Sequence, residues 1–189
     1  MKNFKTTTFL LLLTLCLMSC SGGASKQEAT ASGFAEIENE IKSKFGNDAY
    51  FTDLSITYNE SIGNIISVTV TENPSSLQME EWSNTQDNWT QSSNVSIEIP
   101  EGTKASDFMF KLNETINLKK LGSLVEKSKS QLTKEKNIES PRLHIASIKY
   151  PDNGDVTKAQ YIVMLQPKNG GTTFSFYYTL SEELINLDY

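Results

Sequence analysis

The chain has 189 residues, a formal net charge of −6, one histidine and two cysteines. An acidic chain lacks the basic surface that nucleic-acid phosphates require, and it is equally unsuited to lying on an anionic membrane. So few histidines and cysteines also argue against a zinc site. Residues 34–189 are long enough for one ordinary globular domain.

The first twenty residues have the organisation of a secretory signal peptide. Lys2 and Lys5 supply a positive start, and residues 9–18 form an apolar run that only Thr14 interrupts. A stable transmembrane helix needs about 20 apolar residues, so this run is too short to remain in a bilayer. We therefore expect the segment to be cleaved rather than retained.

The four residues Leu17-Met18-Ser19-Cys20 resemble the bacterial lipobox, with Met18 bulkier than the usual residue at its position. The resemblance implies that a signal peptide of residues 1–19 is removed. It also implies a thioether-linked diacylglycerol on Cys20 and acylation of the new amino terminus. Cys16 then leaves with the signal peptide, so the mature chain has neither a free thiol nor a disulfide. The alternative is an ordinary signal peptide that is cut elsewhere and leaves Cys20 free.

Residues 20–33 are small and polar and contain no aromatic residue, a composition typical of a flexible tether. A tether of this length reaches about 20 Å, so it would keep the domain near the membrane without fixing it there. Surface lipoproteins of the Bacteroidota resemble one another in an acidic cluster after the cysteine, and here only Glu28 follows, after Lys26. We therefore expect an outer-membrane lipoprotein on the periplasmic side. Without Lys2 and Lys5 the mature chain carries 15 basic and 23 acidic residues, a formal charge of −8.

Helices and strands follow from the spacing of apolar residues. Helical spacing predicts one helix over 32–45, which Gly46 can end, and another over 117–132. Alternating apolar and polar residues predict strands at 54–58, 65–70, 77–79, 95–99, 108–112, 147–150, 159–166 and 172–180. The run at 159–166 is apolar on both faces, so we expect it in the interior of the sheet.

Two parts of the sequence repeat the same pattern. Ser55-Ile56-Thr57-Tyr58 and Ser147-Ile148-Lys149-Tyr150 share the form S-I-x-Y, and each lies between a predicted helix and an apolar strand. We interpret the chain as two tandem helix-then-strands units, 34–112 and 117–189. Such runs predict an α+β fold, an antiparallel sheet with helices on one face. The arrangement looks like that of tandem helix-plus-sheet envelope proteins such as the β-lactamase inhibitory protein and the PepSY-like domains.

Few residues could carry catalysis. His144, the single histidine, lies beside alternating apolar positions and is interpreted as a structural or surface residue. The segment from Asp152 to Asp155 lacks the spacing of a calcium loop and is typical of a hairpin turn. The pairs Glu80-Glu81 and Glu182-Glu183 could do acid–base chemistry, but adjacent acidic residues are usually solvated. The sequence contains no recognised catalytic motif, so we expect a non-enzymatic protein without a metal or other cofactor.

Trp82, Trp89 and Tyr177 lie in polar surroundings and form the candidate surface for a ligand or partner. Flat aromatic rings suit sugars, although indole rings also pack in cores. Two functions are compatible with these residues. The first is a non-enzymatic binding or interaction module that engages a protein or peptide. The alternative is a glycan-binding or glycan-processing envelope lipoprotein that uses the tryptophan region.

Overall fold

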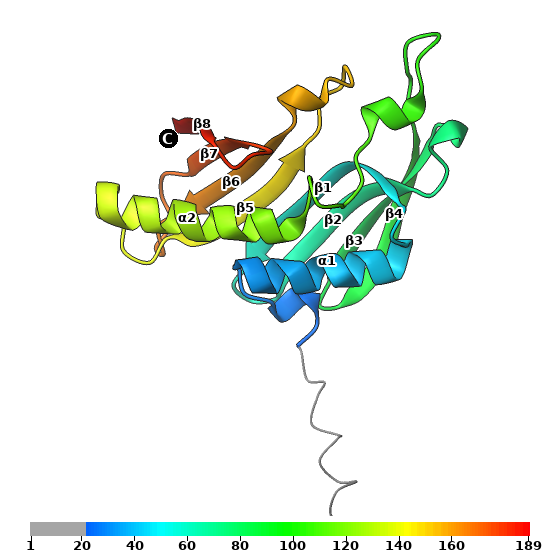
Figure 1. Ribbon diagram of the computed structural model, residues 1–189. Coiled ribbons are helices and arrows are strands. Elements are labelled where there is room, and N and C mark those ends of the chain that lie inside the picture. The colour runs from blue at the N-terminus through cyan, green and yellow to red at the C-terminus, as the bar shows by residue number, and fades with distance from the viewer. Residues whose placement is uncertain (1–21) are drawn as a thin grey trace, which may run out of the picture.

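Two layers make up the part of the chain that the computed structural model describes, residues 22–189. Helices α1 (Ala31–Phe45) and α2 (Leu118–Lys136) lie on one face of an eight-stranded sheet (Figure 1). The strands are β1 (Tyr50–Asn59), β2 (Gly63–Thr71), β3 (Gln78–Thr85), β4 (Asn88–Ser96), β5 (Arg142–Lys149), β6 (Gln160–Gln166), β7 (Phe174–Thr179) and β8 (Leu184–Asp188). The 3-10 helices are η1 (Ala24–Lys26), η2 (Pro74–Ser76), η3 (Ala105–Phe108) and η4 (Val156–Lys158). The expected signal peptide, lipobox and lipidation site Cys20 lie outside the described residues.

The sheet is antiparallel throughout, in the order β4-β3-β2-β1-β5-β6-β7-β8. Each helix is followed by a meander of four strands, and the two meanders meet where β1 pairs with β5. In that pairing Ser55 lies opposite Ser147. The first serines of the two S-I-x-Y motifs therefore face each other across an approximate two-fold axis. The predicted α+β fold is confirmed, and β6 lies inside the sheet as expected.

The hydrophobic core fills the space between the helices and the sheet. On β7, Phe176 and Tyr178 are fully buried, whereas the alternate residues Ser175 and Tyr177 are only half-buried and point to the opposite face. We call these two sides of the sheet the inner face, which the helices cover, and the outer face. The helices contribute mainly Phe34, Ile37, Ile41, Leu118, Leu121 and Val125, all fully buried.

The two helices pack closely because α2 has a glycine at their contact. A Cβ atom at Gly122 would lie 2.2 Å from the carbonyl oxygen of Thr30. Any larger residue there would push the N-terminus of α1 away. The helices are antiparallel and overlap along their N-terminal halves (Figure 1).

Each helix caps the N-terminus of the other with a glutamate. Glu38 Oε2 on α1 accepts a hydrogen bond from Leu118 N at 2.7 Å, and Glu126 Oε2 on α2 accepts one from Ala31 N at 3.0 Å. First-turn N–H groups have no partner within their own helix, and they carry the positive end of the helix dipole. The two carboxylates therefore satisfy the helix ends and join the two halves of the molecule.

The expected strand at 108–112 is wrong. The segment begins at the end of η3, and Phe110 makes only an isolated bridge with Phe51. Phe110 belongs to the main core, whereas Met109 packs against Met79 on the outer face. Phe110 and Leu112 both face the main core, which explains the alternation, but the segment pairs with β1 only at Phe110 and is too short to form a strand.

Edge strands were missed or misplaced. The polar stretch 83–94, which carries no predicted element, forms the end of β3 and most of β4. A further strand, β8, follows the run at 172–180 that was expected to be the last. Both β4 and β8 are edge strands with little buried surface, so they show no clear alternation. The turn expected at 152–155 is longer than a hairpin turn, because Asp155 caps η4 by accepting a hydrogen bond from Thr157 N.

The interpretation of residues 20–33 as a flexible tether is wrong for the part that is described. Residues 24–26 form η1, and α1 already begins at Ala31. Ala24 is 2% exposed and Ser25 is 4% exposed. The segment has the composition of a tether because polar contacts, and not buried apolar side chains, hold it to the domain. None of the helices in residues 22–189 is long and apolar enough to span a membrane.

Candidate functional site

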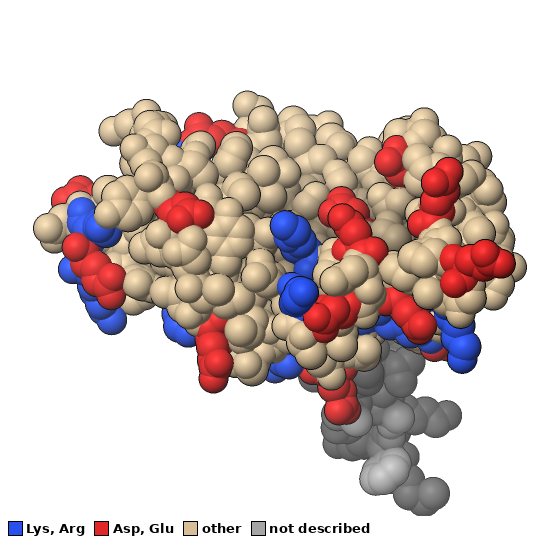
Figure 2. Space-filling model, turned by 90° about the horizontal axis from the view of Figure 1, so that it is seen from above, with Lys and Arg blue, Asp and Glu red and all other residues tan. Residues whose placement is uncertain are grey.

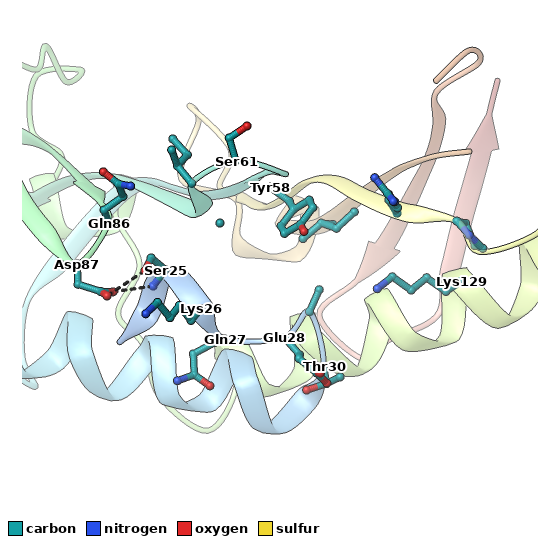
Figure 3. Close-up of a pocket in the computed structure, with 16 residues that line it drawn as sticks. Ser25, Lys26, Gln27, Glu28, Thr30, Tyr58, Ser61, Gln86, Asp87 and Lys129 are labelled. Atoms are coloured by element: carbon teal, nitrogen blue, oxygen red, sulfur yellow. Dashed lines mark hydrogen bonds between the residues drawn. The ribbon is translucent and has the colours of Figure 1, made fainter. Parts of the chain in front are cut away.

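A cleft of about 820 Å³ lies at the end of the molecule where the described chain begins (Figure 3). Pockets for small ligands typically measure about 300–1,000 Å³. The walls come from residues 25–30, the β1–β2 turn, the β3–β4 turn, α2 and the start of β5. The side chains that give it chemical character are Lys26, Glu28, Tyr58, Asp87, Lys129 and Arg142.

One wall is the N-terminal segment 22–30, which we call the clasp. Ser25 holds it to the β3–β4 turn, because its backbone N–H and its hydroxyl donate to the two carboxylate oxygens of Asp87 at 2.8 and 2.9 Å. Ala24 N donates to Glu40 Oε2 on α1 at 3.0 Å. Figure 3 shows the paired bonds between Ser25 and Asp87. The clasp is therefore fixed to two separate elements of the domain.

The β1–β2 hairpin holds the clasp from the other side. Asn64 is 1% exposed, and its amide nitrogen donates to the carbonyl oxygens of Ala24 at 3.1 Å and Gln27 at 2.7 Å. The neighbouring Gly63 has a φ of +83°, and a Cβ atom there would lie 2.0 Å from the carbonyl oxygen of Ser25. Only glycine fits both this backbone conformation and this contact. The hairpin sequence is therefore matched to a docked clasp.

Basic side chains outnumber acidic ones around the cleft, in contrast to the whole protein. Lys26, Lys129 and Arg142 line it with only Glu28 and Asp87 as acidic residues, and Asp87 is already bound to the clasp. By contrast, the view from above the molecule shows acidic side chains gathered mainly over its right-hand half (Figure 2). Three cationic side chains that line one cleft of an acidic protein offer a place for an anionic ligand.

Lys26 and Lys129 are the cations of the cleft that form no ion pair within residues 22–189, and Lys129 is the half-buried one of the two. Its ammonium group also makes no hydrogen bond with any of residues 22–189. Burial lowers the pKa of Lys129, although the charges of Glu126 and Glu28 oppose this effect. Arg142, in contrast, forms an ion pair with Glu60. An anion in the cleft would supply the direct ion pair that neither Glu126 nor Glu28 makes with Lys129.

The candidates for catalysis do not meet at the cleft. His144 is half-buried on β5 and does not line it. Within residues 22–189 no three His, Cys, Asp or Glu residues are grouped as a metal site would require. Asp155 instead caps η4, and the hydrogen bond from the Thr157 hydroxyl lowers its pKa.

The adjacent glutamate pairs are separate from the cleft as well. Glu80 accepts a hydrogen bond from Trp82 Nε1, whereas Glu81 accepts one from the Ser93 hydroxyl. Glu182 and the residue after it lie at the turn between β7 and β8. Neither pair is arranged as two carboxylates flanking one site.

Trp82 and Trp89 lie together on the inner face, between the sheet and the last turn of α1. The ring of Phe45 packs edge-on against both, with centroid distances of 5.8 Å and 5.0 Å. Their indole N–H groups donate to Glu80 at 2.8 Å and to Glu40 at 3.2 Å. Both rings are half-buried against the core, so they act at least partly as packing residues.

Tyr177 does not share a surface with the tryptophans, because it lies on the outer face of β7. It pairs with Ile162, and two strands away Ile145 pairs with Met164. These four residues, Ile145, Ile162, Met164 and Tyr177, form what we call the outer-face patch. Both helices lie on the other face of the sheet (Figure 1), and of the four residues Ile162 is 9% exposed whereas the other three are half-buried. Sequence alternation identified Tyr177 as a surface residue but gave no sign of its neighbours.

Comparisons with known proteins bear on the fold alone. No family model and no curated protein matches the chain. A crystal structure of a predicted lipoprotein from Clostridium difficile 630 superposes with a TM-score of 0.50, covering 88% of this chain and 98% of that one. The sequence identity is 10%, so the two proteins share an architecture.

Proposed function

We propose that this protein is a lipid-anchored protein of the bacterial cell envelope whose domain is a non-enzymatic binding module. The anchor is Cys20, on the strength of the lipobox resemblance, and the shared architecture with a predicted lipoprotein supports the same assignment. The favoured location is the periplasmic side of the outer membrane. The partner is a protein or peptide that binds the outer-face patch.

The difference between the two halves of the sheet carries this proposal. Ser55 and Ser147 are related by the approximate two-fold axis, so strand register pairs each position in one half with a position in the other. The residues of the outer-face patch, in the order Ile145, Ile162, Met164 and Tyr177, correspond in this way to Asp53, Ser67, Thr69 and Ser83.

Small polar residues therefore suffice at these positions for the same fold. An antiparallel sheet can keep one face in water, and its outward residues are then usually polar. At these four positions the first half follows this rule and the second half departs from it. Elsewhere the outer face of the first half also carries apolar residues, Met79 and Val95, but these pack against Ala105 and Met109.

Contiguous apolar side chains that remain partly exposed on a monomer typically mark an interaction surface. Ile145, Met164 and Tyr177 are half-buried, and Ile162 between them is 9% exposed. We attribute the departure to a partner.

The experiment is crosslinking and co-purification of the mature lipoprotein from its own envelope. Exchanging the patch for its counterparts in the other half, with Met164→Thr and Tyr177→Ser, should abolish partner recovery and leave the melting temperature within a few degrees of wild type. The matched control, Thr69→Ser with Ser83→Ala, changes the equivalent positions and should retain the partner. Recovery of the same partner by the exchanged variant would contradict the proposal.

The anchor is tested separately by Cys20→Ser. This variant should take up no labelled palmitate and should leave the membrane fraction, since the thioether requires the cysteine sulfur. Continued labelling of the variant would show that the lipobox interpretation is wrong.

A glycan-binding role is the second candidate, because Trp82 and Trp89 lie together beside Glu40 and Glu80. Against it, both N–H groups are already bound to carboxylates, and Lys44 lies over the Trp82 ring, 4.4 Å from its centroid. Titration with envelope glycans should leave the tryptophan fluorescence unchanged. A saturable change that Trp89→Phe removes would favour the glycan role instead.

A further inference from the structure

The docked clasp sets the distance between the domain and the membrane, provided that Cys20 carries the lipid as proposed above. Chain geometry allows at most about 3.6 Å per residue, so Cys20 and Gly22 are no more than about 7 Å apart. Gly22 is the first residue of the clasp and packs against the rest of it: its carbonyl accepts a hydrogen bond from Gln27, and a Cβ atom on it would be 3.3 Å from that of Lys26. The leash between lipid and domain is therefore two residues long instead of a free tether.

Such a leash determines which end of the domain meets the bilayer. The clasp, the β1–β2 and β3–β4 turns and the start of β5 all lie at the end where the chain enters. The headgroup layer on each side of a bilayer is about 5–7 Å thick. A leash of about 7 Å thus brings the mouth of the cleft to the headgroups.

The cleft at this end has the chemistry of an anion site. Lys129 is half-buried and forms no ion pair within residues 22–189, although Glu126 and Glu28 lie near it. Lys26 and Arg142, which is paired with Glu60, line the same cleft. Tyr58, Ile62 and Leu143 supply apolar surface beside these cations. A phospholipid headgroup offers a phosphate next to an apolar chain, which matches both parts of the lining.

We infer that the cleft binds the phosphate of an anionic phospholipid headgroup in the membrane that holds the anchor. The whole protein is acidic, so the attraction comes from this cleft and not from the surface in general. The bound headgroup and the covalent lipid together fix the orientation of the domain.

Vesicle sedimentation of the unlipidated mature chain, residues 20–189 with Cys20→Ser, tests the inference. The vesicles contain phosphatidylcholine alone or mixed with an equal amount of phosphatidylglycerol. We expect binding that requires phosphatidylglycerol and that weakens about fivefold in Lys129→Gln and in Arg142→Gln, the effect of one basic residue near an anionic surface. Lys158→Gln is the matched control. Lys158 is an exposed lysine just before β6, at the end of the molecule opposite the cleft.

Three results would overturn the inference. One is sedimentation that does not depend on phosphatidylglycerol, or the absence of sedimentation with both kinds of vesicle. Another is an equal loss in all three variants, which would mean general charge attraction. The third is binding of free glycerol phosphate without vesicle binding, which would identify a soluble phosphate as the ligand. Melting temperatures of the variants report whether they fold. Lys129→Arg keeps the positive charge and should bind the vesicles as well as the chain with Lys129. Because the assay uses no lipidated protein and no partner, its outcome is independent of the tests of the anchor and of the outer-face patch.

Discussion

The reciprocal caps between the helices allow a test in which the same kind of contact is removed in two environments. Glu38 is 9% exposed and caps Leu118, which is fully buried, whereas Glu126 is exposed and caps Ala31 at the surface. Glu38 also forms an ion pair with Lys42 at 2.6 Å, which adds about 0.2–0.5 kcal/mol to the expected difference between the two sites. Hydrogen bonds to charged groups contribute about 1.5–3 kcal/mol, and a buried N–H left without a partner keeps its full desolvation cost. We therefore expect Glu38→Ala to lower the free energy of unfolding by about 2–3 kcal/mol.

Glu126→Ala should cost much less. Charge interactions with an exposed helix N-terminus contribute about 0.3–1 kcal/mol, and water can replace the lost acceptor. Glu38→Gln keeps an acceptor oxygen but loses the charge, so its cost should lie between the two. Glu36→Ala, an exposed change on the same helix, is the control and should be nearly neutral.

Urea denaturation of the four variants measures these differences directly. The midpoint should fall while the slope stays constant, since the surface exposed on unfolding is unchanged. In thermal unfolding, a loss of about 2–3 kcal/mol corresponds to about 4–12 °C for a domain of this size. Equal costs for Glu38→Ala and Glu126→Ala would refute the argument that burial of Leu118 N decides the magnitude.

Three other predictions concern the core, the alkaline limit and metals. Phe176→Ala should cost about 3–5 kcal/mol in urea denaturation, whereas Ser175→Ala on the outer face should be nearly silent; a Phe176→Ala protein as stable as wild type would show the strand register to be wrong. Burial raises the pKa of Tyr161 to about 12 from 10, so the unfolded chain ionises first and stability present below pH 10 should be lost as the pH rises towards 12. Tyr161→Phe should flatten that fall in a pH series of denaturation curves. Neither EDTA nor His144→Ala should shift the melting temperature, and a rise of several degrees with millimolar calcium would return Asp152 and Asp155 to consideration as ligands.

The parts of the fold that could be predicted from sequence are those in which the polarity of each residue follows its burial. Phe34, Ile37 and Ile41 show the helical period because one stripe of α1 faces the core, and β7 alternates because only one of its faces does. Edge strands β4 and β8 bury little side-chain surface, so their sequences show no alternation of apolar and polar residues. The similarity of the two halves is visible in only three matching residues, the Ser, Ile and Tyr of S-I-x-Y, which lie where β1 meets β5.

The cleft could not be predicted in this way, because it exists only where five chain segments meet. Lys129 reads as one more lysine on a polar helix face, and Arg142 as a charged residue before a strand. The clasp was misread for a related reason: its polar backbone and side chains are satisfied by Asn64, Glu40 and Asp87, which are distant in sequence. Gly63 is the only local sign, and a glycine in a hairpin is too common to indicate a docked segment.

The two proposed surfaces place different demands on the molecule. The strands run from the cleft end to the opposite end, and the outer face is parallel to them. It therefore stands upright when the cleft faces the bilayer (Figure 1). The outer-face patch is then presented sideways, close to the membrane plane. A flexible tether would let the patch take any orientation, whereas a two-residue leash and a bound headgroup would not. Since a fixed orientation reduces the rotational freedom lost on association, it favours a partner that is itself held in or at the same membrane.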